Sequence, residues 1–425
     1  MANLSKPREA ALKALIFVEK DGAYLNIALR DILASSDMDD RDKALAQMLA
    51  FGAIKHKLYI DNIIKNLSSV RLKKLSVWIH NILRLGIYSL KFLDRIPPSA
   101  TVNECVKLAR RYGHGASAGF VNAILRKASD CGDFLPENKT GAEYLSIKYS
   151  MPLWLTEKWI SDGYSEDFFR AMNEEPPVTV RLNTLKASAL PEAFEKTCLT
   201  PYTYIYKGRG SVEHTFSFKE GHIAVQDGAS QKAVLALNIK KDMKVLDLCS
   251  APGGKTAFIA QLLENTGRVT ACDIHPHKLD LIKSNLNRLG VTNTEVILND
   301  ATIFNDSFKN SFDRVLCDVP CSGLGVLRRK PDIKWTKAEF SNDELVKIQR
   351  KIIDCAVHYV KEGGILLYST CTVNTAENED NIKYILETYP QLSLIDENGS
   401  EAYGTQLLPH TDGTDGFFYA AFERK

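Results

Sequence analysis

Apolar residues recur at helical spacing through the first 128 residues of the chain. The clearest stretch lies between Ser76 and Leu93, where apolar side chains share one helical face and Ser76 is suited to cap the first turn. Pro97-Pro98 interrupts the pattern, and a further helix is expected from Ser99. Consecutive amphipathic helices of this kind predict an all-α bundle. The polar, turn-rich stretch 129–141 has the composition of a linker.

The hydrophobic pattern changes twice after the linker. Residues 142–221 mix helical and strand-like segments, which predicts a small α+β domain, with helices around 154–172 and near 190–196 and strands at 178–182 and 202–206. Beyond Ile223, five apolar strands alternate with amphipathic helices, at 244–248, 268–272, 294–298, 314–317 and 364–368. This alternation predicts a doubly wound, Rossmann-like α/β domain with a mostly parallel sheet, which 417–422 closes as an edge strand. We therefore expect three domains, at 1–140, 141–221 and 222–425.

Composition narrows the class of protein. The chain is 45% hydrophobic and contains no run of about 20 uncharged apolar residues, so we expect a cytoplasmic protein that does not enter a membrane. Its nine cysteines are scattered and form no Cys-x-x-Cys pair, so we expect reduced thiols and no metal site. Nothing in the sequence indicates an oligomer, and a monomer is expected.

Charge is unevenly distributed along the chain. Residues 1–140 contain 22 Lys+Arg and 14 Asp+Glu, a balance of +8, whereas the whole chain has +2, which leaves −6 for the remainder. A basic amino-terminal bundle suits contact with nucleic-acid phosphates, although a solvated helical surface of mixed charge has the same composition. We expect this bundle to have its own core, separate from that of the α/β domain.

A glycine-rich turn follows the first strand of the α/β domain. Its residues are Cys249, Ser250, Ala251, Pro252, Gly253, Gly254 and Lys255. A strand that turns into a helix in this way favours an anionic group at the helix amino terminus. The turn lacks the spacing of a dinucleotide fingerprint and of a phosphate-binding P-loop, which leaves S-adenosylmethionine as the candidate cofactor. Lys255 is placed to contact the cofactor carboxylate or a substrate phosphate, or to remain solvated.

Two strand-end acids support this cofactor site. Asp273 follows the second strand, where it can accept hydrogen bonds from ribose hydroxyls, and Asp300 follows the third, within reach of an adenine. Either acid alone could equally be an ordinary loop or helix-cap residue.

Two cysteines follow the carboxyl ends of later strands. Cys321 lies in Asp318-Val319-Pro320-Cys321, and Cys371 follows Ser369-Thr370 in a polar turn, whereas Cys272 and Cys317 are expected to be small core residues. Carbon-5 of cytosine is a weak nucleophile, so its methylation needs a thiolate that first adds to carbon-6 and creates an enamine. A pair of thiols beside a methyl-donor site therefore points to pyrimidine chemistry. The sequence by itself does not rank the two thiols.

These motifs, together with the final Asp415-Gly416-Phe417-Phe418, resemble those of the NOP2/Sun family of RNA cytosine-5 methyltransferases. The segment Arg328–Trp335 is similar to that of the bacterial subgroup that methylates 16S ribosomal RNA. The first domain resembles the antitermination factor NusB, and the second the family's small RNA-recognition-like module. Ser250 stands where the family usually has Ala, and Met151 where His is common.

The resemblance implies roles for individual residues. Cys371 would be the attacking thiolate, Cys321 would help to eliminate the enzyme, and Asp318 would hydrogen-bond the pyrimidine edge beside the methyl donor. The expected substrate is a hairpin loop of 16S ribosomal RNA, free or in the assembling small subunit, because a flipped base leaves a loop at lower cost.

The loop after Cys321 is basic. Arg328, Arg329, Lys330 and Lys334 are placed to hold RNA phosphates, unless the loop is simply solvated. Two other functions stay open: methylation of transfer RNA or of another ribosomal site, and an RNA-binding factor with a vestigial methyltransferase domain. The presence of every expected site residue disfavours the second.

Overall fold

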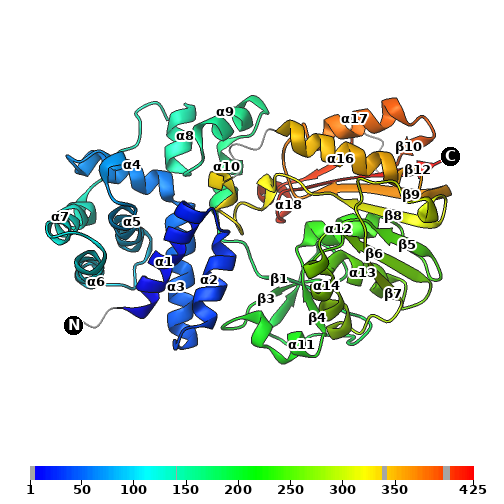
Figure 1. The fold of residues 1–425 in the computed structure, drawn as a ribbon, viewed down its shortest axis with the longest axis horizontal. Coiled ribbons are helices and arrows are strands. Elements are labelled where there is room, and N and C mark those ends of the chain that lie inside the picture. Colours follow the sequence, from blue (N-terminus) through cyan, green and yellow to red (C-terminus); the bar gives the residue numbers. More distant parts are fainter. Residues whose placement is uncertain (1–4, 140, 337–341, 396–402) are drawn as a thin grey trace. The chain divides into compact units, whose positions relative to one another are not determined.

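The computed structural model describes residues 5–139, 141–336, 342–395 and 403–425, shown in Figure 1. These residues form two compact units. The first comprises the chain up to Glu174 together with 327–336, and the second comprises 175–326 and the described residues from 342 onward. This division differs from the three domains expected from the sequence, because residues 142–174 and the basic segment after Leu327 pack with the amino-terminal helices.

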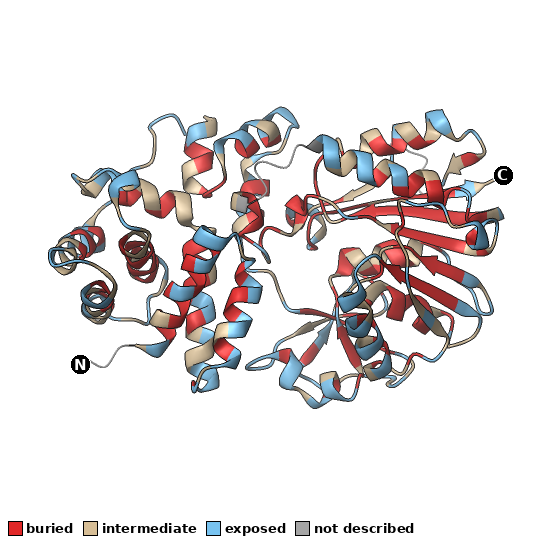
Figure 2. Cartoon of the chain, in the orientation of Figure 1, coloured by how far each residue is buried: buried red, intermediate tan, exposed pale blue. Residues whose placement is uncertain are grey.

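The first unit is entirely helical, as predicted. The inner faces of the helices between residues 6 and 130 form a large apolar core, and Figure 2 shows buried and exposed residues on opposite sides of each long helix. Ser76 caps α5 as expected, since its Oγ accepts a hydrogen bond from the amide of Ile79 at 3.3 Å. The elements are α1 Lys6–Asp21, α2 Leu25–Ala34, α3 Asp40–Lys55, α4 Lys57–Leu67, the 3-10 turn η1 Leu72–Lys74, α5 Val77–Phe92, α6 Pro98–Tyr112, α7 Ser117–Asp130, α8 Ala142–Lys148, α9 Leu153–Ser161, α10 Glu166–Asn173 and α15 Ile333–Thr336.

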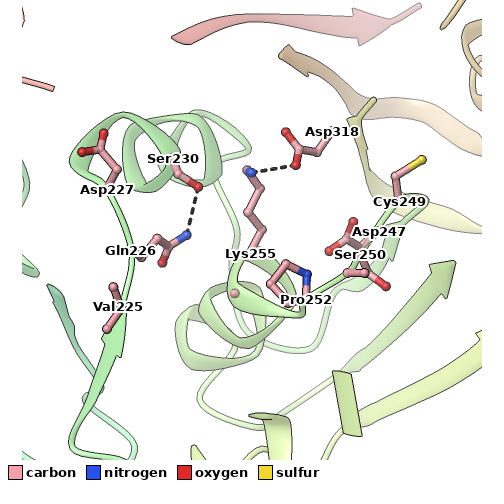
Figure 3. Close-up of a pocket in the computed structure, with 12 residues that line it drawn as sticks. Val225, Gln226, Asp227, Ser230, Asp247, Cys249, Ser250, Pro252, Lys255 and Asp318 are labelled. Carbon is pink, nitrogen blue, oxygen red and sulfur yellow. Dashed lines mark hydrogen bonds and ion pairs between the residues drawn. The ribbon is translucent and has the colours of Figure 1, made fainter. Parts of the chain in front are cut away.

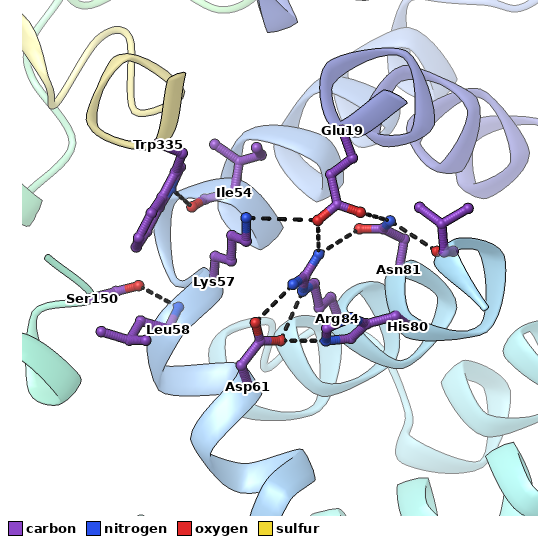
Figure 4. Close-up of polar contacts among 11 residues, drawn as sticks. Glu19, Ile54, Lys57, Leu58, Asp61, His80, Asn81, Arg84, Ser150 and Trp335 are labelled. Carbon is purple, nitrogen blue, oxygen red and sulfur yellow. Dashed lines mark hydrogen bonds and ion pairs between the residues drawn. The ribbon is translucent and has the colours of Figure 1, made fainter. Parts of the chain in front are cut away.

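A buried ionic network joins three helices of this unit. The guanidinium of Arg84, on α5, contacts Asp61 of α4 at 2.7 Å and Glu19 of α1 at 2.5 Å, and His80 contacts Asp61 at 2.7 Å (Figure 4). Only 5% of the Arg84 side chain is exposed. Removal of the cation would leave two carboxylates in a poorly solvated position without their main partner.

We expect Arg84→Met to lower the free energy of unfolding of the first unit by about 3 to 5 kcal/mol, the scale for one partner lost from a buried pair. Urea titration followed by tryptophan fluorescence measures the change. Arg170→Met is the matched control, because Arg170 pairs with Asp167 at 2.8 Å on the surface. Equal effects of the two substitutions would contradict a stabilising role for the buried network.

The basic segment that follows Leu327 packs onto the helices of the first unit. Trp335 Nε1 donates to the carbonyl oxygen of Ile54 at 2.9 Å, and its ring lies 5.2 Å from the Lys57 ammonium (Figure 4). Asp332 Oδ2 accepts from the amide of Leu25 at 3.1 Å. Residues 11–128 nevertheless form a core separate from those of the main sheet, as expected, and Trp335 of the basic segment packs against it.

Helices α8–α10 are also tied to this unit. The Ser150 hydroxyl accepts from the amide of Leu58 at 2.8 Å, and Lys55 donates to the carbonyl oxygen of Glu174 at 3.1 Å. These contacts explain why residues 142–174 group with the bundle rather than with the α+β segment that follows.

The second unit begins with a small antiparallel sheet in the order β2-β3-β1-β4. Its elements are β1 Thr179–Leu182, β2 Phe194–Lys196, β3 Thr203–Tyr206, β4 Ile223–Val225, the 3-10 turn η2 Val212–His214 and α11 Phe216–Lys219. The strands expected at 178–182 and 202–206 are confirmed. The helix expected near 190–196 is wrong, because Phe194–Lys196 pairs with β3 as a strand. β4 pairs with β1, so this sheet extends past the expected boundary at 221.

The main sheet of the second unit has the order β10-β12-β9-β8-β5-β6-β7, with β11 paired to β12. β7, β6, β5, β8 and β9 run parallel to one another, which confirms the doubly wound α/β fold. Two apolar layers cover its faces, one with α12–α14 and the other with α16 and α17 (Figure 1). The strands are β5 Lys244–Asp247, β6 Arg268–Asp273, β7 Thr294–Leu298, β8 Phe312–Asp318, β9 Val360–Thr370, β10 Leu392–Leu394, β11 Thr405–Leu407 and β12 Phe417–Arg424. The helices are α12 Gly228–Ala236, α13 Gly254–Leu262, α14 Pro276–Arg288, α16 Asn342–Ala356, α17 Glu379–Thr388, α18 Pro409–Asp412 and the 3-10 turns η3 Asp306–Phe308 and η4 Leu324–Val326.

The last strand is not at the edge of the sheet. β12 runs antiparallel between β9 and β10, and Phe418 and Phe422 are buried on it. The expected position was wrong because β10 is only three residues long and gives a weak strand signal.

Candidate active site

A cavity of about 230 Å³ lies at the carboxyl end of the main sheet, within the second unit (Figure 3). Its walls come from the glycine-rich turn after β5, from the end of β8 and from the segment between β4 and α12. The lining residues are Val225, Gln226, Asp227, Ser230, Asp247, Cys249, Ser250, Ala251, Pro252, Gly254, Lys255 and Asp318. In an open α/β sheet, this edge is where ligands bind.

The backbone of the glycine-rich turn explains its sequence. Gly253 has φ +95°, in the left-handed region that favours glycine, and it caps the start of α13. Ser250 fixes the other side of the turn, because its hydroxyl donates to the carbonyl oxygen of Cys272, at the end of β6, at 2.8 Å. The first amides of α13 therefore begin at the cavity wall, where they suit a carboxylate.

Lys255 and Asp318 form an ion pair at the cavity. The Lys255 ammonium lies 2.7 Å from Asp318 Oδ2, and the Ser369 hydroxyl donates to Asp318 Oδ1 at 2.8 Å. Burial lowers the pKa of Lys255, but the charge and hydrogen bond of Asp318, followed by the nearby thiol of Cys371, raise the pKa above its ordinary value. Lys255 is thus a persistent cation beside Asp318 and Cys371.

Asp247 ends β5 beneath the same cavity. Thr256 donates to its Oδ2 at 2.7 Å, whereas its Oδ1 is buried and accepts no hydrogen bond from the described residues. Burial raises the pKa of Asp247, and the charge of Asp318 raises it further, whereas the hydrogen bond from Thr256 lowers it. The resulting pKa is about 7. Asp247 therefore offers an acceptor to a ligand.

The two thiols expected at strand ends lie together. Cys321 Sγ and Cys371 Sγ are 3.3 Å apart, one after β8 and the other after β9, which are adjacent parallel strands. The hydrogen bond with Cys371 and burial raise the pKa of the Cys321 thiol. Gly325 donates its amide to the Cys371 carbonyl oxygen at 3.0 Å and packs against Gly416, where a Cβ would lie 2.0 Å from the carbonyl oxygen. Glycine at 325 thus lets the two thiol loops approach closely.

Comparisons with known proteins identify the family. The model of the 16S rRNA methyltransferase RsmB/F family matches residues 234–423, and that of the NusB family matches residues 5–130. The chain is 35% identical to the probable ribosomal RNA small subunit methyltransferase B of Bacillus subtilis, over 98% of both chains.

The chain belongs to the RsmB/F family of 16S rRNA methyltransferases.

Further relatives agree with this assignment. Ribosomal RNA small subunit methyltransferase B of Pectobacterium atrosepticum is 32% identical over 97% of both chains. Among solved structures, PH0851 superposes with a TM-score of 0.82 at 28% identity and covers 100% of both chains. In this chain, the all-helical region that matches the NusB family precedes the α/β region that matches the methyltransferase family.

The other acids expected at the cofactor site lie on the same edge of the sheet but outside the cavity wall. Asp273 is buried at the end of β6, and its Oδ1 accepts from the amide of His275 at 2.9 Å. Asp300 follows β7, where its Oδ1 accepts from the amide and the hydroxyl of Thr302. Both acids hold local turns through one oxygen, and their roles towards a cofactor stay predictions.

The four basic residues expected to hold RNA differ in burial. Lys334 is 2% exposed, and its ammonium donates to the carbonyl oxygen of Lys55 at 2.9 Å inside the helical unit. Arg328 is also buried, whereas Arg329 is half-buried and Lys330 is exposed. Burial lowers the pKa of Lys334, and the charge of Lys55 lowers it further. Lys334 is therefore a packing residue here rather than a surface contact for phosphate.

One wall of the cavity was not predicted from the sequence. Gln226, Asp227 and Ser230 line it from the start of α12, next to the small sheet. Arg181, buried on β1, bonds Gln226 and donates to the carbonyl oxygen of Gly254 at 2.9 Å. Burial, together with the charge of Arg288, lowers the pKa of Arg181 to about 9. Arg181 could not be recognised as a site residue from the local sequence, because its partners Gln226 and Gly254 lie 45 and 73 residues further along the chain.

Among the described residues, no group of three or more His, Cys, Asp or Glu side chains is arranged to hold a metal ion. Within the same residues, no helix has both the length and the apolar character needed to cross a membrane.

Proposed function

We propose that this protein transfers a methyl group from S-adenosylmethionine to carbon-5 of a cytosine in 16S ribosomal RNA, through a covalent adduct at carbon-6. The observation that supports this most directly is the pair of thiols 3.3 Å apart, beside the Lys255–Asp318 ion pair that lines the cavity. A reaction that adds a thiolate to carbon-6 and later eliminates it needs a nucleophile and a second proton-transfer group at one place.

The residues of the cavity fit the proposed cofactor. The amides at the start of α13 would hold the methionine carboxylate, and the unpartnered Oδ1 of Asp247 would accept a hydrogen bond from the ammonium group. Asp273 retains Oδ2 for the ribose hydroxyls, and Asp300 would lie near the adenine. The cofactor, when bound, supplies an electrophilic methyl group.

The chain's own side chains would divide the remaining work. Cys371 would attack carbon-6, and Lys255 would stabilise its thiolate, since a cation beside a thiol favours the ionised form. Asp318 would hydrogen-bond the pyrimidine edge while held by Lys255 and Ser369. Cys321 would help to remove the proton at carbon-5 and release the enzyme.

The proposed substrate is a hairpin loop of 16S ribosomal RNA, free or in an assembling small subunit. A base in a loop is less stacked and leaves its place for a few kcal/mol. Bisulfite sequencing of ribosomal RNA from a strain that lacks this protein tests the target. One cytosine of 16S ribosomal RNA should lose its methyl group and regain it on complementation. A lost methyl group in transfer RNA, with 16S unchanged, would contradict the proposed substrate.

We expect Asp273→Ala to weaken binding of S-adenosylmethionine by about 1 to 3 kcal/mol, the scale for lost hydrogen bonds to a charged group. Isothermal titration calorimetry measures the affinity directly. Asp280→Ala is the control, because Asp280 is exposed on α14, a few residues further along. Unchanged affinity of the Asp273 variant would reject the ribose contact.

A further inference from the structure

A buried carboxylate is bonded to the backbone next to one of the two thiols. Glu377 is 0% exposed and precedes α17, on the loop that follows Cys371. Its Oε2 accepts a hydrogen bond from the amide of Ser322 at 2.8 Å and another from Gln349 Nε2 at 2.9 Å. Its Oε1 accepts from Asn374 Nδ2 at 2.9 Å. All three partners donate, so both oxygens of the carboxylate are used.

The contacts of Glu377 enclose the backbone of Cys321. The amide of Ser322, which donates to Glu377, belongs to the residue directly after Cys321. The carbonyl oxygen of Pro320, the residue directly before Cys321, accepts a hydrogen bond from Gln349 Nε2 at 3.0 Å. Gln349 therefore bridges Pro320 and Glu377. Together, Glu377 and Gln349 hold the backbone on both sides of Cys321.

The same cluster is joined to the loop of the second thiol. The hydroxyls of Ser322 and Thr372 lie 2.8 Å apart, and Thr372 follows Cys371. Asn374, which donates to Glu377, lies on the same loop. One carboxylate thus connects the segment after β8 with the segment after β9, and the 3.3 Å separation of the sulfur atoms depends on the positions of these two segments.

We propose that Glu377, together with Gln349, is a positioning residue that holds the Cys321 thiol in place beside the Cys371 thiol. This inference rests on the proposed function, in which Cys321 acts in the elimination step. Glu377 holds the backbone of Ser322 directly and that of Pro320 through Gln349. Like the hydrogen bond with Cys371 and burial, the charge of Glu377 also raises the pKa of the Cys321 thiol. Its loss should therefore impair the step that needs Cys321 more than the attack by Cys371.

Glu377→Gln tests this division between the two steps. The substituted amide has the same shape but presents an N–H group where Glu377 has an acceptor, so it cannot keep all three contacts. We expect turnover to fall about 10- to 100-fold, the scale for hydrogen bonds to a charged group, while the rate of adduct formation changes by less than about 3-fold. A protein–RNA adduct should then accumulate in the steady state and be visible on a denaturing gel.

Two further variants separate positioning from stability. Gln349→Met keeps a similar volume, removes the bond to Pro320 and should give the same accumulation. Tyr384→Phe is the control, because Tyr384 joins α17 to α16 through a hydrogen bond to Asp354 at 2.7 Å that involves neither Glu377 nor Gln349. It should accumulate no adduct. Unchanged affinity for S-adenosylmethionine, measured by calorimetry, shows which variants are folded.

The outcomes distinguish this inference from the proposed function. Cys321→Ala is run on the same gel, and its failure to form an adduct would overturn the covalent mechanism itself. An adduct from Cys321→Ala but none from either folded variant, Glu377→Gln or Gln349→Met, would overturn the positioning role. Equal slowing of attack and turnover would do the same, because it would show a general structural effect.

Discussion

Cys371→Ala is expected to abolish methylation of 16S ribosomal RNA, with a loss of at least about 10³-fold, the scale seen when a catalytic nucleophile is removed. Without addition to carbon-6, carbon-5 does not gain the electron density that it needs to take the methyl group. Transfer of labelled methyl groups from S-adenosylmethionine to RNA measures the rate. The affinity for the cofactor should be unchanged, since Cys371 does not line the cavity.

A matched thiol is available as a control for this substitution. Cys198 is exposed and lies between β2 and β3 of the small sheet, rather than after β8 or β9 of the main sheet. Cys198→Ala should retain full activity, which would exclude a general effect of cysteine removal. Retained methylation by Cys371→Ala, with its loss in Cys321→Ala, would reverse the roles of the two thiols.

Cys321→Ala is expected to methylate one cytosine per enzyme molecule and then stop. In the proposed mechanism, attack and methyl transfer use Cys371, whereas release of the product needs the proton at carbon-5 to be removed. Rapid-quench measurement with labelled S-adenosylmethionine should therefore show a burst of about one methyl group per enzyme, followed by turnover slowed at least about 10²-fold. Continued turnover at the wild-type rate would remove Cys321 from the elimination step.

The sequence was sufficient to predict the parallel strands of the main sheet and the thiol pair. Alternating apolar and helical segments predicted β5 to β9 to within about two residues at most ends, because parallel buried strands have a strong local pattern. The position of both cysteines followed from one geometric rule, that the carboxyl ends of parallel strands share an edge. Cys272 and Cys317 are buried, as expected for core residues.

Features that depend on distant packing were not predictable in the same way. Lys334 lies in a run of basic residues, which locally indicates a surface loop, yet it is covered by helices almost 280 positions away in the sequence. In the sequence, Glu377 has the position of an ordinary acid near the start of a helix. Only the structure shows its contacts with Ser322 and Gln349. Burial of this kind arises from tertiary contacts that no local pattern records.

Tertiary packing also divides the residues that the sequence predicts to contact RNA. Of the four basic residues expected to hold phosphates, Lys330 is exposed and Lys334 is buried. Lys330 therefore stays a candidate for phosphate contact. Lys334 instead joins Asp332 and Trp335 in the segment that packs against the helices of the first unit.

The covalent adduct is the most direct test of the proposed mechanism. Cys321→Ala is incubated with 16S ribosomal RNA and S-adenosylmethionine, denatured, digested and analysed by mass spectrometry. We expect a peptide that contains Cys371 joined through sulfur to a cytosine that already carries the new methyl group, and no such peptide from the Cys321→Ala, Cys371→Ala double variant. Methylated RNA with no cross-linked peptide, in both the single and the double variant, would contradict covalent catalysis by this protein.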